Sequence, residues 1–496
     1  MEKSYDTIVI GSGLGGLVSA LILAMDGQKV AVLEKNVQFG GNLQSFSRKK
    51  CLFDSGVHYL GGLSEGQNLY RYFDFLGTME DLKVHKMDEV FDQVIFEDDI
   101  LAYPLAQGYE AFVDNLSQIF PEEKSTLQKY VDDLQLVSNA FPRYQPGGLR
   151  PLRLELLAMN AKNYFDQLTQ NQKLKAVLCG QSFLYGGLES ETPFYLHALT
   201  VNSYVQSAWK CVNGGSSITK ALLKQLKSHG AEVFKRAEVT GFDFDEERII
   251  SVKTNEGKVF FAKNFISNID LKKTVQLVGR QHFKKAYTNR IDSLQPSKAC
   301  FSVYLVLKPK SIAYQNHNFY HFKNAQSCLG AVAGQPDFYM LSFTPSRQHP
   351  EFAESCTIIT YMDFSEVEQW GSTFNTAANP KERAVGYEKF KQEKAAEIIR
   401  LVGKKFPEIE DAVSAVYTSS PLSYRDYIGC EAGGMYGYKV ESSHPMAAVF
   451  SPKTKVPNLF LTGQSVNMHG ILGVTIGAFS TCSEILGKEI FTNENH

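Results

Sequence analysis

The stretch Tyr5-Asp-Thr-Ile-Val-Ile-Gly-Ser-Gly-Leu-Gly-Gly16 leads through an apolar segment into Lys29-Val-Ala-Val-Leu-Glu-Lys35. This order predicts a buried strand, a glycine turn, a helix and a second strand that ends in an acid. In such a unit Gly11 permits the tight turn, Gly13 lets the backbone approach a pyrophosphate, and Gly16 lets the helix lie close to the strand. The pattern is typical of a dinucleotide-binding domain.

The acidic residue at the end of the second strand is Glu34, and Lys35 follows it. Dinucleotide-binding units hydrogen-bond a ribose hydroxyl with a carboxylate at this position, and that carboxylate repels a 2′-phosphate. The sequence therefore favours an adenosine without a 2′-phosphate. Leu14 and Gly15, which begin the helix, belong to the same predicted site. The alternative is a βαβ unit that binds no ligand.

Length and composition limit the class of the protein. At 496 residues the chain is longer than one ordinary domain, so we expect a dinucleotide-binding domain and a second domain of similar size. Lysine and arginine number 51 against 53 acidic residues, and this balance offers no general attraction to nucleic acid. The eight cysteines lie far apart without the spacing of a zinc site, so we predict no metal centre.

Targeting and membrane signals are weak. The N-terminus has no secretory signal pattern, and no uninterrupted apolar segment reaches the ~20 residues that cross a bilayer. We therefore expect a cytoplasmic protein. Peripheral membrane contact stays open because residues 149–159 combine two arginines with an apolar stretch, although a buried cap helix would show the same pattern. The sequence does not indicate an oligomeric state.

The chain alternates between two kinds of sequence, which predicts domains that are discontinuous. A glycine-rich but apolar segment at 40–62 suits backbone that lies against a ligand, and helical patterns broken by prolines dominate the region after residue 85. We expect a dinucleotide-binding domain with a β-meander, formed by residues 1–85, 205–275 and 421–496. The substrate domain, a mixed sheet with an inserted helical cap, would comprise residues 86–204 and 276–420.

Three further motifs carry a resemblance to a known family, in the order Phe53-Asp-Ser-Gly-Val-His-Tyr-Leu-Gly-Gly62, Gly433-Gly-Met-Tyr-Gly437 and Leu459-Phe-Leu-Thr-Gly-Gln464. Together with the opening glycine turn, they resemble the FAD-dependent phytoene desaturase, carotenoid isomerase and retinol saturase family over nearly the whole chain. The first of them is most similar to the retinol saturase branch. The resemblance implies an α/β, glutathione-reductase-like fold with FAD in a Rossmann-like domain.

The resemblance also implies which residues would hold FAD. The glycine turn and Glu34 would hold the adenosine diphosphate part, with the adenine against the backbone of Val239. Gly40 and Gly41 would lie against the pyrophosphate and ribityl chain, and Asn42 stands where many relatives have a basic residue, which implies weaker flavin binding. A helix that begins near Gly473 would point its positive end at the flavin. The residues that would contact the ribityl chain and ring are Gly463, Gln464, Gly473 and Val474.

The substrate implied by the resemblance is an apolar polyene or isoprenoid lipid. Reduction of a conjugated double bond adds a hydride to one carbon and a proton to its neighbour, and desaturation reverses both steps. His58 and Tyr59 are the candidates for proton delivery, although a histidine in a glycine loop is also a common scaffold hydrogen bonder. Because the chain has one strong dinucleotide motif, any NAD(P)H donor would bind transiently.

Retinol-saturase-like reduction is the expected activity, with desaturation next. A flavin-dependent cis–trans isomerase of polyenes is the alternative within the family. From another class, a prenyl-lipid carrier of the GDP-dissociation-inhibitor type resembles the opening turn but does not need the segment 462–473 that a flavin contacts. The aromatic residues of 193–209 fit the wall of a substrate tunnel, and core packing explains them equally well.

Overall fold

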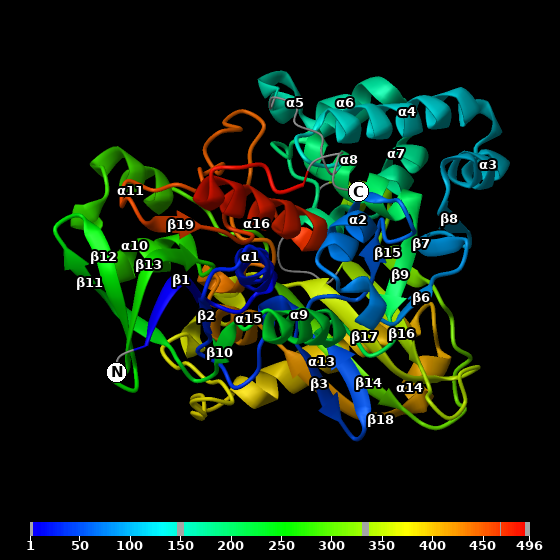
Figure 1. Ribbon diagram of the computed structural model, residues 1–496. Helices are drawn as coiled ribbons and strands as arrows, with labels where there is room; N and C mark the ends of the chain where they lie inside the picture. The colour runs from blue at the N-terminus through cyan, green and yellow to red at the C-terminus, as the bar shows by residue number, and fades with distance from the viewer. Residues whose placement is uncertain (1–2, 146–152, 330–336, 467, 492–496) are drawn as a thin grey trace.

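The computed structural model of the chain describes residues 3–145, 153–329, 337–466 and 468–491. Its strands form two large sheets, with a group of helices above the second (Figure 1). The tail 492–496 and the first part of the segment 149–159 lie outside the described residues.

The first sheet confirms the α/β fold with a Rossmann-like unit. Its strand order is β10-β2-β1-β13-β12-β11, and β19 lies beside β13. Strands β10, β2, β1, β13 and β19 run parallel, while β11, β12 and β13 form the predicted antiparallel meander. The bounds are β1 Ser4–Ile10, β2 Val30–Leu33, β10 Glu232–Phe234, β11 Val239–Asp245, β12 Arg248–Thr254, β13 Val259–Ser267 and β19 Leu459–Leu461.

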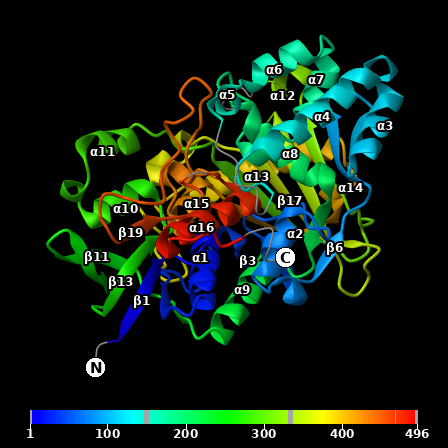
Figure 2. The same cartoon turned by 45° about the horizontal axis from the view of Figure 1, so that its top comes forward.

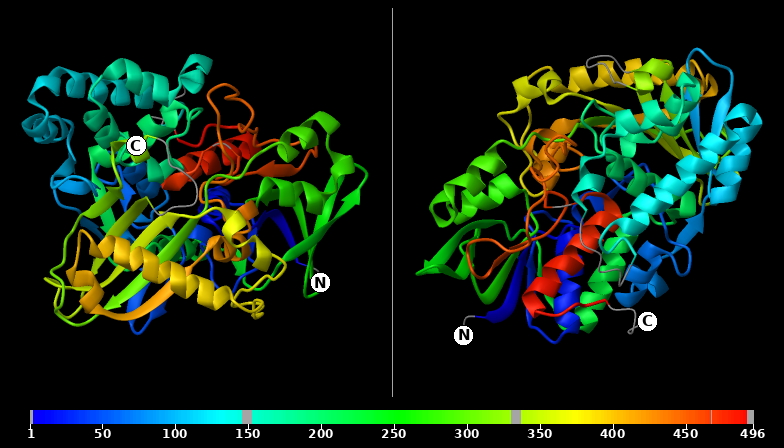
Figure 3. Two further views of the ribbon diagram at one scale, coloured as in Figure 1. Left: turned by 180° about the vertical axis from the view of Figure 1, so that it is seen from behind. Right: turned by 90° about the horizontal axis from the view of Figure 1, so that it is seen from above.

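Helices cover this sheet on the side that carries the glycine turn. Helix α1 (Leu14–Met25) lies beside α16 (Gly470–Leu486) in both the front and top views, and α9 (Ser216–Ser228) shares their apolar cluster (Figures 1 and 3). Helix α1 is apolar on every side and buried from Leu14 to Ala24, because it lies between the sheet and α16. Segments from both ends of the chain therefore build one layer.

The second sheet has the strand order β18-β14-β17-β16-β15-β7-β8, antiparallel except where β15 pairs with β7. Its side chains alternate between two faces. Leu341 and Ile358 pack towards the long helix α13 (Tyr387–Gly403), which crosses the sheet in the rear view of Figure 3, while Met340 and Ile359 face the helical cap. The bounds are β7 Val90–Phe96, β8 Ala102–Ala106, β14 Cys300–Leu307, β15 Asn318–Phe322, β16 Phe338–Pro345, β17 Ala353–Tyr361 and β18 Val413–Ser419.

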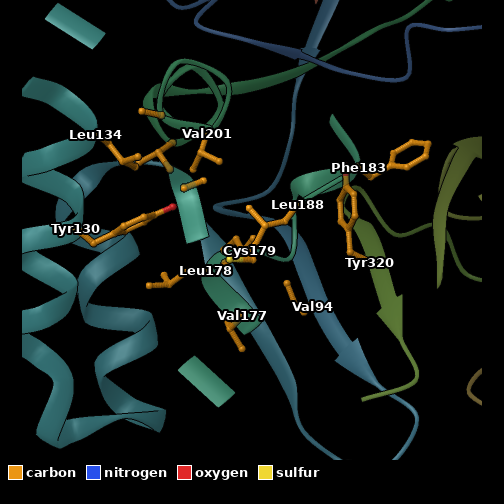
Figure 4. Packing of buried hydrophobic residues seen from close by; sticks show 14 of the residues in the cluster. Val94, Tyr130, Leu134, Val177, Leu178, Cys179, Phe183, Leu188, Val201 and Tyr320 are labelled. Atoms are coloured by element: carbon orange, nitrogen blue, oxygen red, sulfur yellow. The ribbon is translucent and has the colours of Figure 1, made fainter. Parts of the chain in front are cut away.

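The helical cap lies above the second sheet (Figure 2) and packs on it through one apolar cluster. Figure 4 shows part of this cluster, in which Tyr130 and Leu134 of the cap face Val201. The cap helices are α3 Tyr109–Ile119, α4 Lys124–Ala140, α5 Leu154–Ala158, α6 Ala161–Leu168, α7 Gln172–Leu178 and α8 Phe194–Gln206.

The region after residue 85 begins with strands, which the sequence analysis did not predict. β7 and β8 occupy its first twenty residues and complete the second sheet. Pro104, which was interpreted as a helix breaker, lies in β8 at the edge of the sheet, where a missing N–H is tolerated. The pairing of β7 with β15, far along the chain, overrides the local helical pattern.

Smaller elements connect the two sheets. These are a hairpin of β3 (Ser45–Arg48) with β4 (Cys51–Asp54) and a small sheet of β5 (Leu60–Gly61), β9 (Ala208–Cys211) and β6 (Val84–Lys86). The remaining α-helices are α2 Asn68–Phe75, α10 Leu271–Val278, α11 Lys285–Asp292, α12 Ala325–Cys328, α14 Glu408–Ala412 and α15 Pro421–Ile428. The strands of the first sheet come from the three predicted segments; the domain boundaries themselves stay a prediction.

Candidate cofactor and substrate site

A cavity opens at the carboxyl ends of the parallel strands β1, β2, β13 and β19, the edge at which open α/β sheets bind ligands. It continues from this edge to the face of the second sheet that carries Met340 and Ile359. Most of the residues predicted for a cofactor line it: Gly11, Gly13, Leu14, Gly15, Glu34, Lys35, Gly40, Gly41, Asn42, Val239, Gly463, Gln464 and Val474.

Two glycine turns from opposite ends of the chain meet in this cavity. A Cβ atom on Gly15 would lie 3.1 Å from the backbone nitrogen of Gly463, so the two turns are in contact. Gly11 and Gly463 have φ angles of +93° and +98°, which side chains rarely tolerate. Gly16 does not line the cavity; a Cβ there would strike the carbonyl oxygen of Gly11, as expected for close packing of helix and strand.

The Glu34 carboxylate is buried at the end of β2 and is held by the glycine turn. One of its oxygens accepts hydrogen bonds from the backbone N–H of Ser12 at 3.0 Å and from the Ser12 hydroxyl at 2.6 Å. The other accepts from the Asn36 N–H at 2.8 Å. Glu34 is thus fixed in place beside the cavity. Lys35, next to it, donates to the Asp426 carbonyl oxygen at 2.8 Å, and burial lowers the pKa of its ammonium group.

The segment 40–62 begins against the glycine turn. The Gly40 N–H donates to the Ser12 carbonyl oxygen at 3.1 Å, and Gly40 has a φ angle of +114°. Asn42 donates from its side-chain amide to the Gln464 side-chain oxygen at 3.4 Å. At this position a neutral amide connects the N-terminal and C-terminal parts of the cavity wall.

The last helix begins earlier than predicted. α16 starts at Gly470 with His469 as its N-cap, so Gly473 lies inside the helix and does not line the cavity, and a Cβ on Gly473 would be 2.7 Å from Cβ of Met468. Gly473 is thus not part of the cavity wall, and its contact with the cofactor stays a prediction. Gly470 and Ile471 line the cavity instead, and the first N–H groups of an α-helix have no partner within the helix.

His58 and Tyr59 both line the cavity. Burial, with the positive charge of Lys210 nearby, lowers the pKa of His58 to about 4, so its imidazole is neutral at ordinary pH. The Tyr59 hydroxyl donates to the buried carboxylate of Asp92 at 2.8 Å and lies 2.6 Å from the Tyr320 hydroxyl. Its ring lies beside that of Tyr204, with 4.3 Å between the ring centroids.

The far part of the cavity is mostly apolar. Its walls come from the helical cap, the second sheet and the loop after α15: Phe183, Leu184, Tyr204, Met340, Ile359, Met435 and Tyr436. Both interpretations of the aromatic segment 193–209 hold in part, since Tyr204 lines the cavity whereas Phe194 and Tyr195 pack in the core. In the same segment His197 is a core residue, bonded to the hydroxyls of Tyr130 and Tyr185.

Sequence reasoning missed several residues of the cavity wall. Asn268 follows β13 and lies where the glycine turns meet, with its side-chain amide 3.2 Å from the Gly11 carbonyl oxygen. Its position directly after a buried parallel strand was a usable signal, because such strand ends meet at the ligand-binding edge. Asp92 gave no such signal, because a single acid in an apolar strand does not show which side chains face it.

The fold and the glycine turns can be compared with known proteins. The sequence profile of the family described as "Flavin containing amine oxidoreductase" matches residues 14–485. The chain belongs to this family. It is also 27% identical to the all-trans-retinol 13,14-reductase of Rattus norvegicus, over 99% of this chain and 87% of that protein. The chloroplastic prolycopene isomerase of Arabidopsis thaliana is 25% identical, over 94% and 79%.

A solved structure supports the fold independently. The crystal structure of an oxidoreductase from Methanosarcina mazei superimposes with a TM-score of 0.65, covering 97% of this chain and 100% of that one, at 15% identity. Membership of the flavin-containing amine oxidoreductase family and this fold together confirm the predicted fold class and the predicted flavin enzyme. The structure describes no helix of the length and apolar character that a membrane crossing needs.

The residues present fit an FAD group. The dinucleotide part of FAD needs a glycine turn at a helix N-terminus and a ribose acceptor, which the Gly11–Gly16 turn, the start of α1 and Glu34 supply. The start of α16 offers a second set of N–H donors. When bound, the flavin supplies hydride transfer to or from carbon.

Proposed function

We propose that this protein uses FAD to reduce a carbon–carbon double bond of a long apolar polyene or isoprenoid lipid. The observation that carries the proposal is the continuous cavity, which joins the glycine turns at the sheet edge to an apolar chamber under the helical cap. A flavin held at the first part would present its ring to an apolar molecule in the second. The similarity to all-trans-retinol 13,14-reductase favours reduction over desaturation.

The chain's own residues have distinct tasks in this proposal. Glu34 would bind the adenosine ribose, and the N–H groups that begin α1 would bind the pyrophosphate. The start of α16 would stabilise negative charge that collects on the reduced ring. We assign proton delivery to the wall formed by His58 and Tyr59, since both lie in the cavity between the glycine turns and the apolar chamber.

Cis–trans isomerisation of a polyene is the second candidate, supported by the similarity to prolycopene isomerase. It would use the same cavity without a net change in the substrate's hydrogen count. A prenyl-lipid carrier does not need the contact of Gly463 with the first glycine turn, which a flavin site uses. We also infer that an NAD(P)H donor, if used, binds transiently, because the chain carries one dinucleotide fingerprint.

The predicted contact with a membrane surface would be made by the helical cap. In the described part of the segment 149–159, Leu154 is exposed on α5, whereas Leu156 and Leu157 are buried in the cap core. Met159, directly after α5, is exposed as well, so this pattern fits an amphipathic helix that lies on the protein with apolar side chains on its outer face.

The decisive experiment starts with the colour of the purified protein. We expect a yellow protein whose flavin absorption is bleached by dithionite. The photoreduced enzyme, incubated without oxygen, should then add two hydrogens to a member of a panel of retinoids, carotenoids and prenyl alcohols, as measured by product mass. An unchanged mass with altered double-bond geometry would identify the isomerase instead. Colourless protein that takes up no added FAD would refute the enzyme proposal, and oxidation of a primary amine control alone would refute the polyene substrate.

A further inference from the structure

Behind the cavity wall, a buried carboxylate is bonded to the candidate proton donor. Asp92, on β7, has no exposed surface and accepts hydrogen bonds from the Tyr59 hydroxyl at 2.8 Å, the Gln181 amide at 2.6 Å and the Asn318 amide at 2.9 Å. Tyr320 completes the group through its hydroxyl, 2.6 Å from that of Tyr59. Of these two tyrosines, Tyr59 is the one that is bonded to Asp92 and lines the cavity.

The shell of Asp92 is suited to two protonation states. With the carboxylate ionised, Tyr59, Gln181 and Asn318 all donate to it. The side-chain oxygen of Asn318 is buried and has no hydrogen-bond partner among the described residues. A protonated Asp92 has one hydrogen to donate, and the Tyr59 oxygen, 2.8 Å away, is an acceptor already in place. The Tyr59 hydroxyl can therefore donate to the ionised carboxylate and accept from the protonated carboxyl group.

Asp92 and the nearby Lys210 both have pKa values close to neutral pH. Burial raises the pKa of Asp92 to about 7, although its three donors and the positive charge of Lys210 oppose the shift. Burial lowers the pKa of the Lys210 ammonium group to about 8, against the effect of Asp92 and Asp88. The titratable groups around this pair are Tyr59, Tyr204, Tyr320, His58, Asp88, His317 and Tyr314. Lys210 would stabilise the carboxylate once its proton has left.

We propose that Asp92 is a positioning residue that controls the direction of the Tyr59 hydroxyl and supplies its replacement proton. While ionised, Asp92 binds the Tyr59 hydrogen and keeps it out of the cavity. Once protonated, Asp92 donates to the Tyr59 oxygen, and the Tyr59 hydrogen is released for the cavity that Tyr59 lines. The inference rests on the proposed function, because it assigns this hydrogen to the alkene.

The step balances in atoms and charge. The Tyr59 O–H bond breaks as a C–H bond forms on one alkene carbon, and the Asp92 O–H bond breaks as the Tyr59 O–H bond is restored. The two electrons reach the neighbouring carbon as a hydride from the reduced flavin. Asp92 is left as a carboxylate near Lys210 and takes a proton from water before the next turnover.

Infrared difference spectroscopy of the purified full-length protein tests this directly. The protein is labelled with carboxyl-¹³C aspartate and titrated from about pH 5 to about pH 9. We expect the C=O band of a protonated, isotope-shifted aspartic acid that disappears with a midpoint at about pH 7. The band should be absent in Asp92→Asn, and Tyr59→Phe should shift its frequency, because it removes a hydrogen-bond partner. Burial also raises the pKa of Asp54 to about 6, but Asp54 is bonded to Ser45 and Gly215. If the Asn variant does not fold, the shift in labelled Tyr59→Phe therefore still assigns the band to Asp92.

A second aspartate serves as the matched control. Asp133 on α4 accepts from the Tyr164 hydroxyl at 2.8 Å, the same pairing in the cap, and is not part of the cavity wall. Asp133→Asn should keep the band and the wild-type pH profile of turnover, whereas Asp92→Asn should lower turnover about tenfold or more and remove the step near neutral pH.

Three results have fixed meanings. A titration without a protonated aspartate near neutral pH, or a band that Tyr59→Phe does not move, overturns the role of Asp92. Turnover whose pH profile is the same in Asp92→Asn also overturns it, and leaves the proposed function intact. A wild-type protein that binds FAD but converts no polyene overturns the proposed function, and the infrared spectra still decide whether Asp92 controls the Tyr59 hydroxyl.

Discussion

At the scale of single residues, the cavity depends on places where a side chain has no room and on groups whose charge is suppressed. Gly13 lies between the cavity and the Asn268 amide, and a Cβ atom there would be 2.9 Å from the Asn268 amide nitrogen. His58 is a neutral imidazole in the wall of the same cavity. A substitution of Gly13 tests cofactor binding, and a substitution of His58 tests turnover.

Gly13→Val should weaken FAD binding by tenfold or more, which corresponds to about 1.4 kcal/mol, because the new side chain displaces Asn268 or occupies the space of the pyrophosphate. Fluorescence titration of the cofactor-free protein with FAD measures this loss. Gly241→Val is the control, since a Cβ on Gly241 meets no atom within 4 Å. Full flavin occupancy in Gly13→Val would contradict the assignment of this turn to the cofactor.

His58→Ala should keep its flavin and turn over its substrate roughly tenfold or more slowly, the effect of losing a group that moves a proton. Since burial lowers the pKa of His58 to about 4, the imidazole is uncharged above that pH, and the wild-type profile should show no step from His58 near its ordinary pKa. Single-turnover kinetics with a photoreduced flavin measure the rate. His85→Ala, on an exposed histidine of β6, is the control; equal rates in both variants would remove His58 from the mechanism.

At the scale of elements, Arg143 connects the cap to the last helix and to the segment that follows it. Arg143 follows α4 and binds Glu489 through two nitrogens, at 2.7 and 3.1 Å, and it also donates to the Ser480 hydroxyl of α16 at 3.0 Å. Its carbonyl oxygen accepts from the Tyr72 hydroxyl of α2 at 2.6 Å. A single residue thus links three elements from distant parts of the chain around the cavity.

Arg143→Ala should lower the free energy of unfolding by about 1–3 kcal/mol, since the pair is bidentate and three quarters of the arginine side chain is covered. Urea denaturation followed by tryptophan fluorescence measures the change. Lys129→Ala is the control, because Lys129 pairs with Asp133 on the surface of α4 and should cost no more than about 0.5 kcal/mol. Equal losses of unfolding free energy in the two variants would show that the Arg143 contacts stabilise the fold no more than a surface ion pair does.

At the scale of the whole molecule, the cofactor site is shared by segments that are remote in sequence. β1 with α1, β10 to β13, and β19 with α16 each supply part of the cavity wall, and no one of them forms it alone. A ligand that binds only the folded state stabilises it by mass action. Bound FAD should therefore stabilise the three segments together.

Removal of FAD should raise amide hydrogen exchange in β1, α1, β13 and α16 together, and much less in β14 to β17 of the second sheet, which has its own core with α13. At FAD concentrations about 1,000 times the dissociation constant, the lost stabilisation is about 4 kcal/mol. Hydrogen exchange with mass spectrometry of both forms measures this. A rise confined to one of the segments would contradict a shared site.

Local patterns were sufficient for the first βαβ unit, the meander, the glycine loop at 40–62 and most of the cavity's glycines. The interpretation of residues 90–106 as helical was wrong, because the pairing of β7 with β15 decided their conformation. The start of α16 was placed three residues late, since the Gly470 turn and the packing of Met468 against Gly473 are not visible in a spacing of apolar residues.

The sequence by itself determined that a strand, a glycine turn, a helix and an acid follow one another at the start of the chain. These features depend on steric limits and side-chain periods over a few neighbouring residues. Only the tertiary structure decided that Gly463 touches Gly15 and that Asp92 faces Tyr59. Such contacts depend on how strands separated by long stretches of chain pack together, and no local spacing encodes that packing.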